Sequence, residues 1–213
     1  MKRSLLVTAV AASLASVAAA DSYTDASNDL FDNGFDNLDI TGVSMSDDGV
    51  NLSVAVTTRG FQTWTKYMMY FNTTGAGTTS NAWARPVNLT SNIDYYVGSW
   101  VDASTDNAQF WAWGSGAWGQ TGTLTNAVSG NTVTFTMSLA SLGLSGGQTI
   151  YFDVATSGGG NDPGVDHLSR TDMATSGWGS ASTSGDFLAY TTVPTPGAIA
   201  LLGLAGLAGR RRR

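Results

Sequence analysis

Short runs of alternating apolar and polar residues recur through the middle of the chain, separated by clusters of Gly, Asn, Asp and Ser. Residues 132–138 are the clearest case, because Val133, Phe135 and Met137 alternate with threonines. A period of two places successive side chains on opposite faces of a β-strand, and Thr, Val, Tyr, Phe and Trp favour strands. No segment has sustained helical periodicity. The pattern therefore predicts an all-β domain, either a sandwich or a barrel.

Eight segments carry this strand pattern. Two of them, 40–45 and 51–56, flank Ser46-Asp47-Asp48-Gly49, which is typical of a hairpin turn. The other predicted strands are 67–71, 94–101, 108–113, 132–138, 149–155 and 186–191. The only helical turn is expected in residues 139–144, closed by Gly143 or Gly146. Long loops, where binding sites usually lie, are expected in the Gly-rich segments 73–80, 114–126, 157–164 and 175–185.

The N-terminal end is typical of a secretion signal rather than of folded structure. Lys2 and Arg3 precede an apolar stretch over residues 5–17, and Ala18-Ala19-Ala20 supplies the small residues that a signal peptidase reads. The stretch is shorter than the ~20 apolar residues that a membrane-spanning helix needs. We therefore expect a signal helix within residues 1–20 and cleavage before Asp21.

The C-terminal end, residues 193–213, combines a Pro-containing motif, an apolar helix and an arginine cluster. A helix over residues 198–208 reaches only ~16 Å, against a hydrocarbon core of ~30 Å. The layout resembles the PEP-CTERM sorting signal of exopolysaccharide-producing bacteria, which exosortase-type enzymes process, although Thr195 stands where that motif has Glu. The resemblance implies a secreted or cell-surface protein that its tail tethers transiently to the membrane. The candidate sorting residues are Val193, Pro194, Thr195, Pro196, Arg210, Arg211, Arg212 and Arg213.

Residues 21–192, which are expected to form one domain, are strongly acidic. They contain sixteen Asp and only four basic residues, a net charge of −12; the basic residues are Arg59, Lys66, Arg85 and Arg170. Such a surface repels phosphate backbones, so we expect no nucleic-acid partner. The chain has neither Cys nor Glu. Thiol chemistry, zinc-thiolate sites and disulfides are therefore excluded.

A series of short motifs between residues 25 and 168 resembles the DOMON-like or family-nine carbohydrate-binding β-sandwich group. In order along the chain, these motifs are Asp25-Ala-Ser-Asn-Asp29, 38–43, 81–86, 95–102, 142–144, 152–154 and Val165-Asp166. The resemblance implies a two-sheet antiparallel β-sandwich of jelly-roll-like form. It also implies a domain that is often calcium-bound and that displays a ligand face without doing chemistry.

Seven Trp are a large number of bulky rings for one small domain. In residues 109–113, a period of two places Trp111 and Trp113 on one face and Phe110 on the other. Exposed rings stack on the apolar C–H faces of sugars, which makes these residues candidates for a binding platform. The alternatives are that Trp111 and Trp113 are a core pair and that Arg85 is a structural ion-pair partner. The candidate ligand-binding residues are Trp83, Arg85, Trp111, Trp113 and Trp118.

Two acidic groups are candidate calcium sites, because calcium takes six to eight oxygen ligands. The first is the series Asp25, Asp29, Asp32, Asp36 and Asp39, and the second is Asp153, Asn161, Asp162 and Asp166. Neither spacing matches an EF-hand loop, and the alternative is that both groups are solvated turn formers. The predicted ligands are Asp25, Asp29, Asp153, Asp162 and Asp166.

The inventory of reactive side chains argues against catalysis. His167 is the only histidine, and no Ser lies in a nucleophile-elbow pattern. A glycosidase needs two carboxylates about 5–10 Å apart, which a set of aspartates leaves open. We therefore expect a secreted, non-catalytic protein whose partners are polysaccharide or the exopolysaccharide matrix, the signal peptidase and the sorting enzyme. A structural matrix protein without a specific ligand is the alternative, and a glycan hydrolase is the third possibility.

Overall fold

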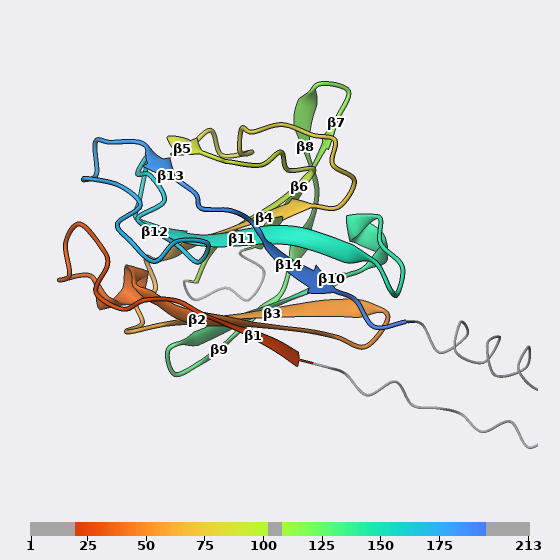
Figure 1. Ribbon diagram of the computed structural model, residues 1–213, viewed down its shortest axis with the longest axis horizontal. Coiled ribbons are helices and arrows are strands. Elements are labelled where there is room, and N and C mark those ends of the chain that lie inside the picture. Colours follow the sequence, from red (N-terminus) through yellow and green to blue (C-terminus); the bar gives the residue numbers. More distant parts are fainter. Residues whose placement is uncertain (1–19, 102–107, 195–213) are drawn as a thin grey trace, which may run out of the picture.

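Two antiparallel β-sheets packed face to face make up the part of the chain that the computed structural model describes, residues 20–101 and 108–194 (Figure 1). Sheet A has the strand order β1-β2-β3-β10-β9, and sheet B has the order β12-β11-β4-β6-β7-β8 with β14 also paired to β11. The predicted all-β, antiparallel, sandwich-like architecture is therefore confirmed. The predicted signal helix and sorting helix lie outside the described residues.

The strands of sheet A are β1 (Ala20–Thr24), β2 (Ile40–Asp47), β3 (Asn51–Thr58), β9 (Asn126–Ser129) and β10 (Thr132–Ser138). Those of sheet B are β4 (Lys66–Asn72), β6 (Tyr95–Trp100), β7 (Ala108–Gly114), β8 (Ala117–Leu124), β11 (Thr149–Ser157), β12 (Asp166–His167) and β14 (Leu188–Thr191). A separate parallel pair consists of β5 (Val87–Asn88) and β13 (Ser182–Thr183). The described residues also include the 3₁₀ turns η1 (Asp36–Leu38) and η2 (Ala140–Leu142).

The main core lies between the two sheets and follows the period of two seen in the sequence. On β10, Val133, Phe135 and Met137 are buried, whereas Thr136 on the opposite face is exposed. The hairpin of β2 and β3 also forms as predicted, with antiparallel pairing from Ile40↔Thr58 to Asp47↔Leu52. The predicted turn after β10 is η2, which Gly143 ends in the left-handed conformation (φ 66°). Alternation in the sequence thus gave the correct faces for the central strands.

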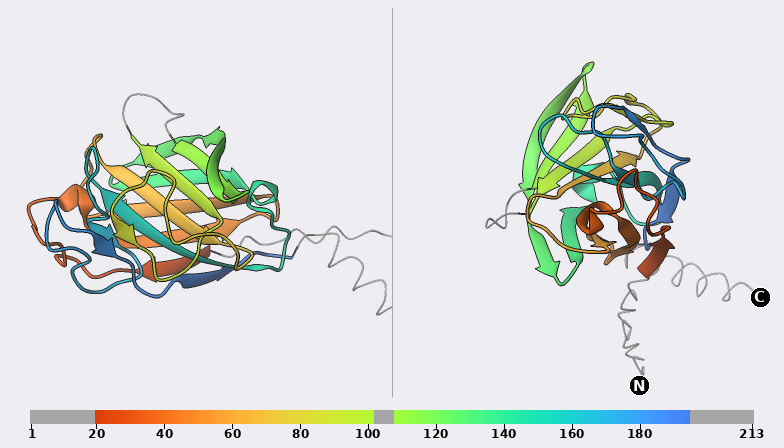
Figure 2. Two further views of the ribbon diagram at one scale, coloured as in Figure 1. Left: turned by 90° about the horizontal axis from the view of Figure 1, so that it is seen from above. Right: turned by 90° about the vertical axis from the view of Figure 1, so that its left-hand side faces the viewer.

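The central strands of sheet B are buried on both faces. Five consecutive residues of β4 are buried, and Met68 and Tyr70 point away from sheet A into a second apolar cluster. Two long segments, 73–94 and 158–187, cover this outer face and carry β5 and β13 (Figure 1). Figure 2 shows the first of them crossing over the strands in the view from above. The segments predicted as loops in this region therefore form a third layer.

The segment 114–126, predicted to be a loop, is largely strand. Residues Ser115 and Gly116 have positive φ angles of 54° and 80°, which is the geometry of a two-residue hairpin turn between β7 and β8. The strand β8 consists mostly of Gly, Thr and other small residues with exposed side chains, so it lacks the apolar alternation on which the prediction depended. Trp118 consequently lies in a strand and not in a loop.

The described chain ends just beyond β14. The backbone N–H of Val193 donates to Asp47 Oδ2 at 2.9 Å, and Pro194 is exposed. The other predicted sorting residues, from Thr195 onward, lie outside the described residues. Within the part of the chain that is described, no helix has the length and apolar character needed to cross a membrane.

Candidate functional site

Aspartates from distant parts of the chain meet at one end of the sandwich. Asp29, Asp39 and Asp166 each place a carboxylate oxygen within 4.8 Å of the other two. Asp29 follows β1, Asp39 precedes β2, and Asp166 begins β12. Asp25 is close enough for its charge to raise the pKa of Asp166. These four residues are called the acidic cluster below.

Several carboxylate oxygens in the acidic cluster have no hydrogen-bond partner among the described residues. Asp39 is fully buried, yet its Oδ1 is unpartnered, as are both oxygens of Asp29 and Oδ2 of Asp25. Backbone N–H groups satisfy the remaining oxygens of Asp25 and Asp166, and that of Asn28 donates to Asp39 Oδ2 at 2.9 Å. Buried polar atoms without partners are costly and uncommon. A cation bound between Asp29, Asp39 and Asp166 would supply a partner to unpartnered oxygens of Asp29 and Asp39.

Burial makes the charged forms of these carboxyl groups unfavourable. Desolvation is the largest cause that raises the pKa of Asp25 to about 8, and neighbouring carboxylates raise it further. Desolvation also raises the pKa of Asp29 and of Asp166. The basic group beside the cluster is Arg59, whose Nη1 lies 3.4 Å from Asp39 Oδ2. One guanidinium group faces four carboxyl groups, so full ionisation of the cluster requires further positive charge, such as that of a bound cation.

The donor set of the acidic cluster fits calcium. Calcium binds carboxylate and carbonyl oxygens at 2.3–2.6 Å in irregular geometry, with six to eight ligands supplied by loops and water. Asp25, Asp29 and Asp39 come from one such loop, and Asp166 comes from the short strand that pairs with the end of β11. In the sequence, Asp166 belongs to the second acidic group and not to the first. The fold joins that residue to the first group across 127 positions of sequence between Asp39 and Asp166.

Asp153 and Asp162, which were also predicted as metal ligands, already have other partners. The carboxylate of Asp153 accepts two backbone N–H bonds through Oδ1, and its Oδ2 lies 2.7 Å from His167 Nδ1. The backbone carbonyl of Asp162 accepts a hydrogen bond from Arg85 Nη1 at 3.0 Å. Neither carboxylate belongs to the group of clustered oxygens found among the described residues. Asp153 therefore supports the neighbouring strand, and Asp162 holds Arg85 in place.

The two other acids of the first series are surface residues. Asp36 forms an ion pair with Arg59 Nη2, and Asp32 Oδ1 accepts the N–H of Gly34 at 3.0 Å. Both side chains are exposed. For these two residues the turn-forming interpretation is the one that the geometry supports.

Asp153, His167 and Ser182 form a hydrogen-bonded series that resembles a catalytic triad. In such a triad the Asp orients the His, the His acts as the base and the Ser is the nucleophile. His167 Nδ1 lies 2.7 Å from Asp153 Oδ2, and its Nε2 lies 3.2 Å from Ser182 Oγ. All three residues have no exposed surface. The N–H of Gly164 donates to Ser182 Oγ at 3.1 Å, and a Cβ at Gly164 would meet the His167 ring. The Ser182 hydroxyl is sealed from solvent, so a substrate cannot reach it. The series of hydrogen bonds instead links β11, β12 and β13.

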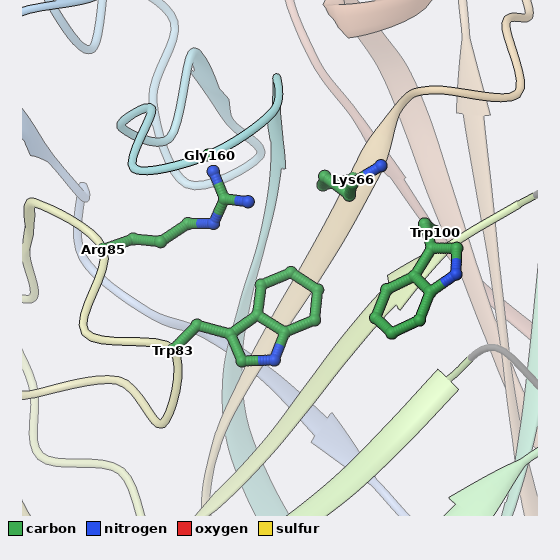
Figure 3. A pocket seen from close by; sticks show the side chains of 5 residues that line it. All are labelled: Lys66, Trp83, Arg85, Trp100 and Gly160. Carbon is green, nitrogen blue, oxygen red and sulfur yellow. The ribbon is translucent and has the colours of Figure 1, made fainter.

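A pocket of about 220 Å³ lies at the outer face of sheet B, lined by Lys66, Trp83, Arg85, Trp100 and Gly160 (Figure 3). The Trp83 and Trp100 rings have centroids 6.0 Å apart and an interplanar angle of 34°. Both indoles are only partly buried. The Arg85 guanidinium carbon lies 5.3 Å from the Trp83 ring centroid, within the range of a cation–π contact. This set of residues is called the indole pocket below.

Backbone geometry fixes the Trp83 ring against sheet B. A Cβ added to Gly98 on β6 would lie 2.4 Å from two atoms of the indole, so the ring rests directly on the glycine. Its Nε1 donates to Gln109 Oε1 at 2.7 Å. The period of two places Trp100 on the same face of β6 as Gly98 and Tyr96, and the Trp83 ring packs edge-on against Tyr96 at 5.7 Å. The position of Trp83 therefore depends on a glycine directly beneath it.

The substitution Gly98→Ala is expected to displace the Trp83 ring, because the new methyl group would occupy its place. Overpacking of this kind costs about 1–3 kcal/mol. We expect a lower melting temperature and an altered near-ultraviolet circular dichroism signal from the indole. Gly119→Ala is the control, because a Cβ at that glycine meets nothing within 4 Å. Equal melting temperatures for the two variants would contradict the conclusion that the Trp83 ring rests directly on Gly98.

Arg85 is held by neutral groups. Its Nη1 donates to Ser157 Oγ at 2.9 Å and to the carbonyl of Asp162, while the side chain of Asn81 bonds its backbone N–H and carbonyl. No carboxylate of the described residues lies within ion-pair distance of it. Arg85 therefore forms no ion pair with a described residue, unlike the structural ion-pair partner considered for it above. Its guanidinium group lines the indole pocket instead.

The other predicted aromatic residues lie away from the indole pocket. Trp111 points to the outer face and packs on the second apolar cluster, opposite to Phe110 in the main core, as the period of two predicted. Trp118 donates from Nε1 to the Ser80 carbonyl at 3.2 Å. Its ring makes an edge contact of 5.5 Å with Trp113, and all three tryptophans are partly buried. These three tryptophans connect the hairpin of β7 and β8 to the segments that cover sheet B.

Three residues of these sites were absent from the predicted ligand sets. Trp100 and Gly98 share a face of the predicted strand, so the period of two contained a signal for Trp100. Lys66 was visible only as one of four basic residues in an acidic domain. Asp39 was included in the first acidic series, but only its complete burial marks it as part of the site.

Comparison with known protein families and with curated proteins finds no match for this chain. Among solved structures, one described as "pH-induced modulation of Streptococcus parasanguinis adhesion by Fap1 fimbriae" is similar over 86% of this chain and 93% of its own, at 14% identity and a TM-score of 0.23. A likeness at that score carries no argument about fold or function.

Proposed function

We propose that this chain is an exported, non-catalytic protein that binds polysaccharide in the indole pocket. The observation that carries the proposal is the pairing of two partly exposed rings, Trp83 and Trp100, with the polar groups of Lys66 and Arg85 around one cavity. Aromatic faces pack on the apolar face of a sugar ring, and polar side chains beside them bind its hydroxyls. Sites of this composition hold ligands without any reactive group.

The size of the pocket favours one sugar unit over a long segment of chain. Its volume of about 220 Å³ is below the ~300–1,000 Å³ typical of clefts for drug-sized ligands. A polysaccharide would therefore place one residue in the indole pocket and extend its neighbours along the surface. The rival proposal, a matrix protein without a specific ligand, expects buried tryptophans, and the exposure of Trp83 and Trp100 favours the binding function.

The proposal includes a calcium ion at the acidic cluster and a jelly-roll-like arrangement of the sandwich. Calcium is supported by the unpartnered oxygens of Asp25, Asp29 and Asp39. The ion would join the segment after β1 to β12 and neutralise part of the cluster's charge. Its contribution is to stability, because the indole pocket is lined by residues of other segments.

Export is the remaining part of the proposal. The leader before Asp21 and the tail after residue 192 support secretion and transient tethering to the membrane, with a signal peptidase and an exosortase-type enzyme as processing partners. The exopolysaccharide matrix is then the source of the proposed ligand. A glycan hydrolase is disfavoured because it needs a pair of carboxylates beside the sugar, and the described residues that line the indole pocket include no Asp.

Trp100→Ala is expected to weaken glycan binding about 30-fold, since truncating a tryptophan anchor costs on the order of 2 kcal/mol or more. Trp113→Ala is the matched control, because Trp113 is also partly buried but does not line the indole pocket. A glycan array identifies the ligand of the unsubstituted protein, and titration calorimetry then compares the variants. Equal losses in both variants, or no binding to any polysaccharide, would overturn the proposal.

A further inference from the structure

The four basic residues of this acidic domain are unevenly distributed over its structure. Arg59 is ion paired with Asp36 and Asp39, and Arg170 is ion paired with Asp172. The other two basic residues, Lys66 and Arg85, line the same small pocket. Half of the domain's basic residues thus meet at one site, although its residues 21–192 contain sixteen aspartates.

Arg85 has hydrogen-bonding capacity left for a ligand. Within the described residues only Nη1 has acceptors, the hydroxyl of Ser157 and the carbonyl of Asp162. Figure 3 shows the guanidinium group between Gly160 and the Trp83 ring, with its nitrogens at the edge of the cavity. The residue is 8% exposed, and desolvation lowers its pKa. A buried cation without a carboxylate partner is unfavourable unless a ligand supplies the negative charge.

We infer that the sugar seated in the indole pocket carries a carboxylate, that is, a uronic acid residue. The inference rests on the proposed glycan-binding function. A planar guanidinium group binds a carboxylate through two parallel N–H bonds, which a neutral hydroxyl cannot reproduce. Lys66, whose Nζ donates to the Trp64 carbonyl at 2.9 Å, lines the opposite side of the cavity.

The charge of the rest of the domain restricts which acidic glycans fit. A net charge of −12 over residues 21–192 repels a dense polyanion along the surface. Among the described residues, the lining of the indole pocket combines two basic side chains with no Asp. We therefore expect the protein to prefer glycans in which single uronate residues are separated by neutral sugars over polyuronates in which every residue is charged.

The test compares acidic oligosaccharides with their carboxyl methyl esters, which keep the sugar ring and remove the charge. Oligosaccharides containing one glucuronate or one galacturonate are titrated into the full purified protein by calorimetry. We expect esterification to weaken binding at least about 10-fold. This comparison uses the unsubstituted protein, so it does not depend on whether any variant folds.

Substitution provides the second measurement. Arg85→Gln is expected to remove the difference between the acid and its ester, whereas Arg170→Gln, which removes the same charge at an ion pair beside Asp172, is expected to keep it. Binding of neutral glycans with no preference for the acid would overturn the inference and leave the glycan-binding function intact, as would a preference for sulfated glycans alone. Failure of every glycan to bind would overturn both proposals.

Discussion

Removal of calcium with a chelator is expected to lower the melting temperature of the purified protein by about 8–16 °C. A ligand present at 1,000 times its dissociation constant stabilises the folded state by ~4.1 kcal/mol, and 1 kcal/mol shifts the melting temperature of a domain of this size by ~2–4 °C. The physical cause lies in the acidic cluster, where Asp25, Asp29 and Asp39 have unpartnered oxygens that an ion would satisfy. Differential scanning calorimetry with calcium and with EGTA measures the shift.

Single substitutions locate the ion. Asp39→Asn and Asp166→Asn are expected to abolish the calcium-dependent shift, because both residues belong to the group of clustered carboxylates. Asp32→Asn is the control, since this exposed aspartate of the same segment caps a turn at Gly34. A melting temperature that is the same in calcium and in EGTA would show that no ion is bound at the cluster. Loss of the shift in the Asp32 variant would place the ion elsewhere.

The calcium-free protein is expected to become less stable as the pH rises from 5 to 8, by on the order of 5–10 °C in melting temperature. The pKa of Asp25 is about 8 in the folded state, against ~3.9 in an unfolded chain. A group whose folded pKa is raised stabilises the protein fully below the unfolded pKa, and this contribution is lost as the pH rises through the folded pKa. Asp25 is partly exposed, so solvent screening reduces the effect below the full linkage value.

Calcium reverses this dependence, because the ion binds the ionised carboxylates and competes with protons for them. Melting curves at pH 5 and pH 8, each with calcium and with EGTA, therefore give a difference that grows with pH. Asp25→Asn should reduce the slope of the EGTA series, since the amide does not titrate, while Asp29 and Asp166, whose pKa values are also raised, keep part of it. A calcium-free protein that gains stability between pH 5 and pH 8 would contradict the linkage assigned to the cluster.

Local alternation was enough to predict the central strands and their inward faces. Val133, Phe135 and Met137 lie in the core because a period of two allows only one buried face. The same reasoning separated Trp111 from Phe110 correctly. These predictions succeed because each strand carries its own pattern, without reference to its neighbours in space.

Contacts between distant segments could not be predicted in this way. Asp39 and Asp166 meet only because the end of β11 pairs with β12, and a two-residue strand has no periodic signal. β8 was also missed, because its Gly and Thr residues depend on pairing with β7 rather than on burial. The covering layer over sheet B places Trp83 on Gly98, fifteen positions further along the chain, and no local rule specifies that contact.

The strand β1 is the outermost strand of sheet A, and the chain leads from it directly into Asp25 and Asp29. Its burial is slight, with four of its five residues exposed, so that the pairing with β2 is its main attachment. Detachment of this segment would uncover the backbone donors and acceptors of β2, and unprotected sheet edges recruit strands from other molecules. Whatever holds the acidic cluster together therefore also keeps the longer strand β2 from becoming the open edge of sheet A.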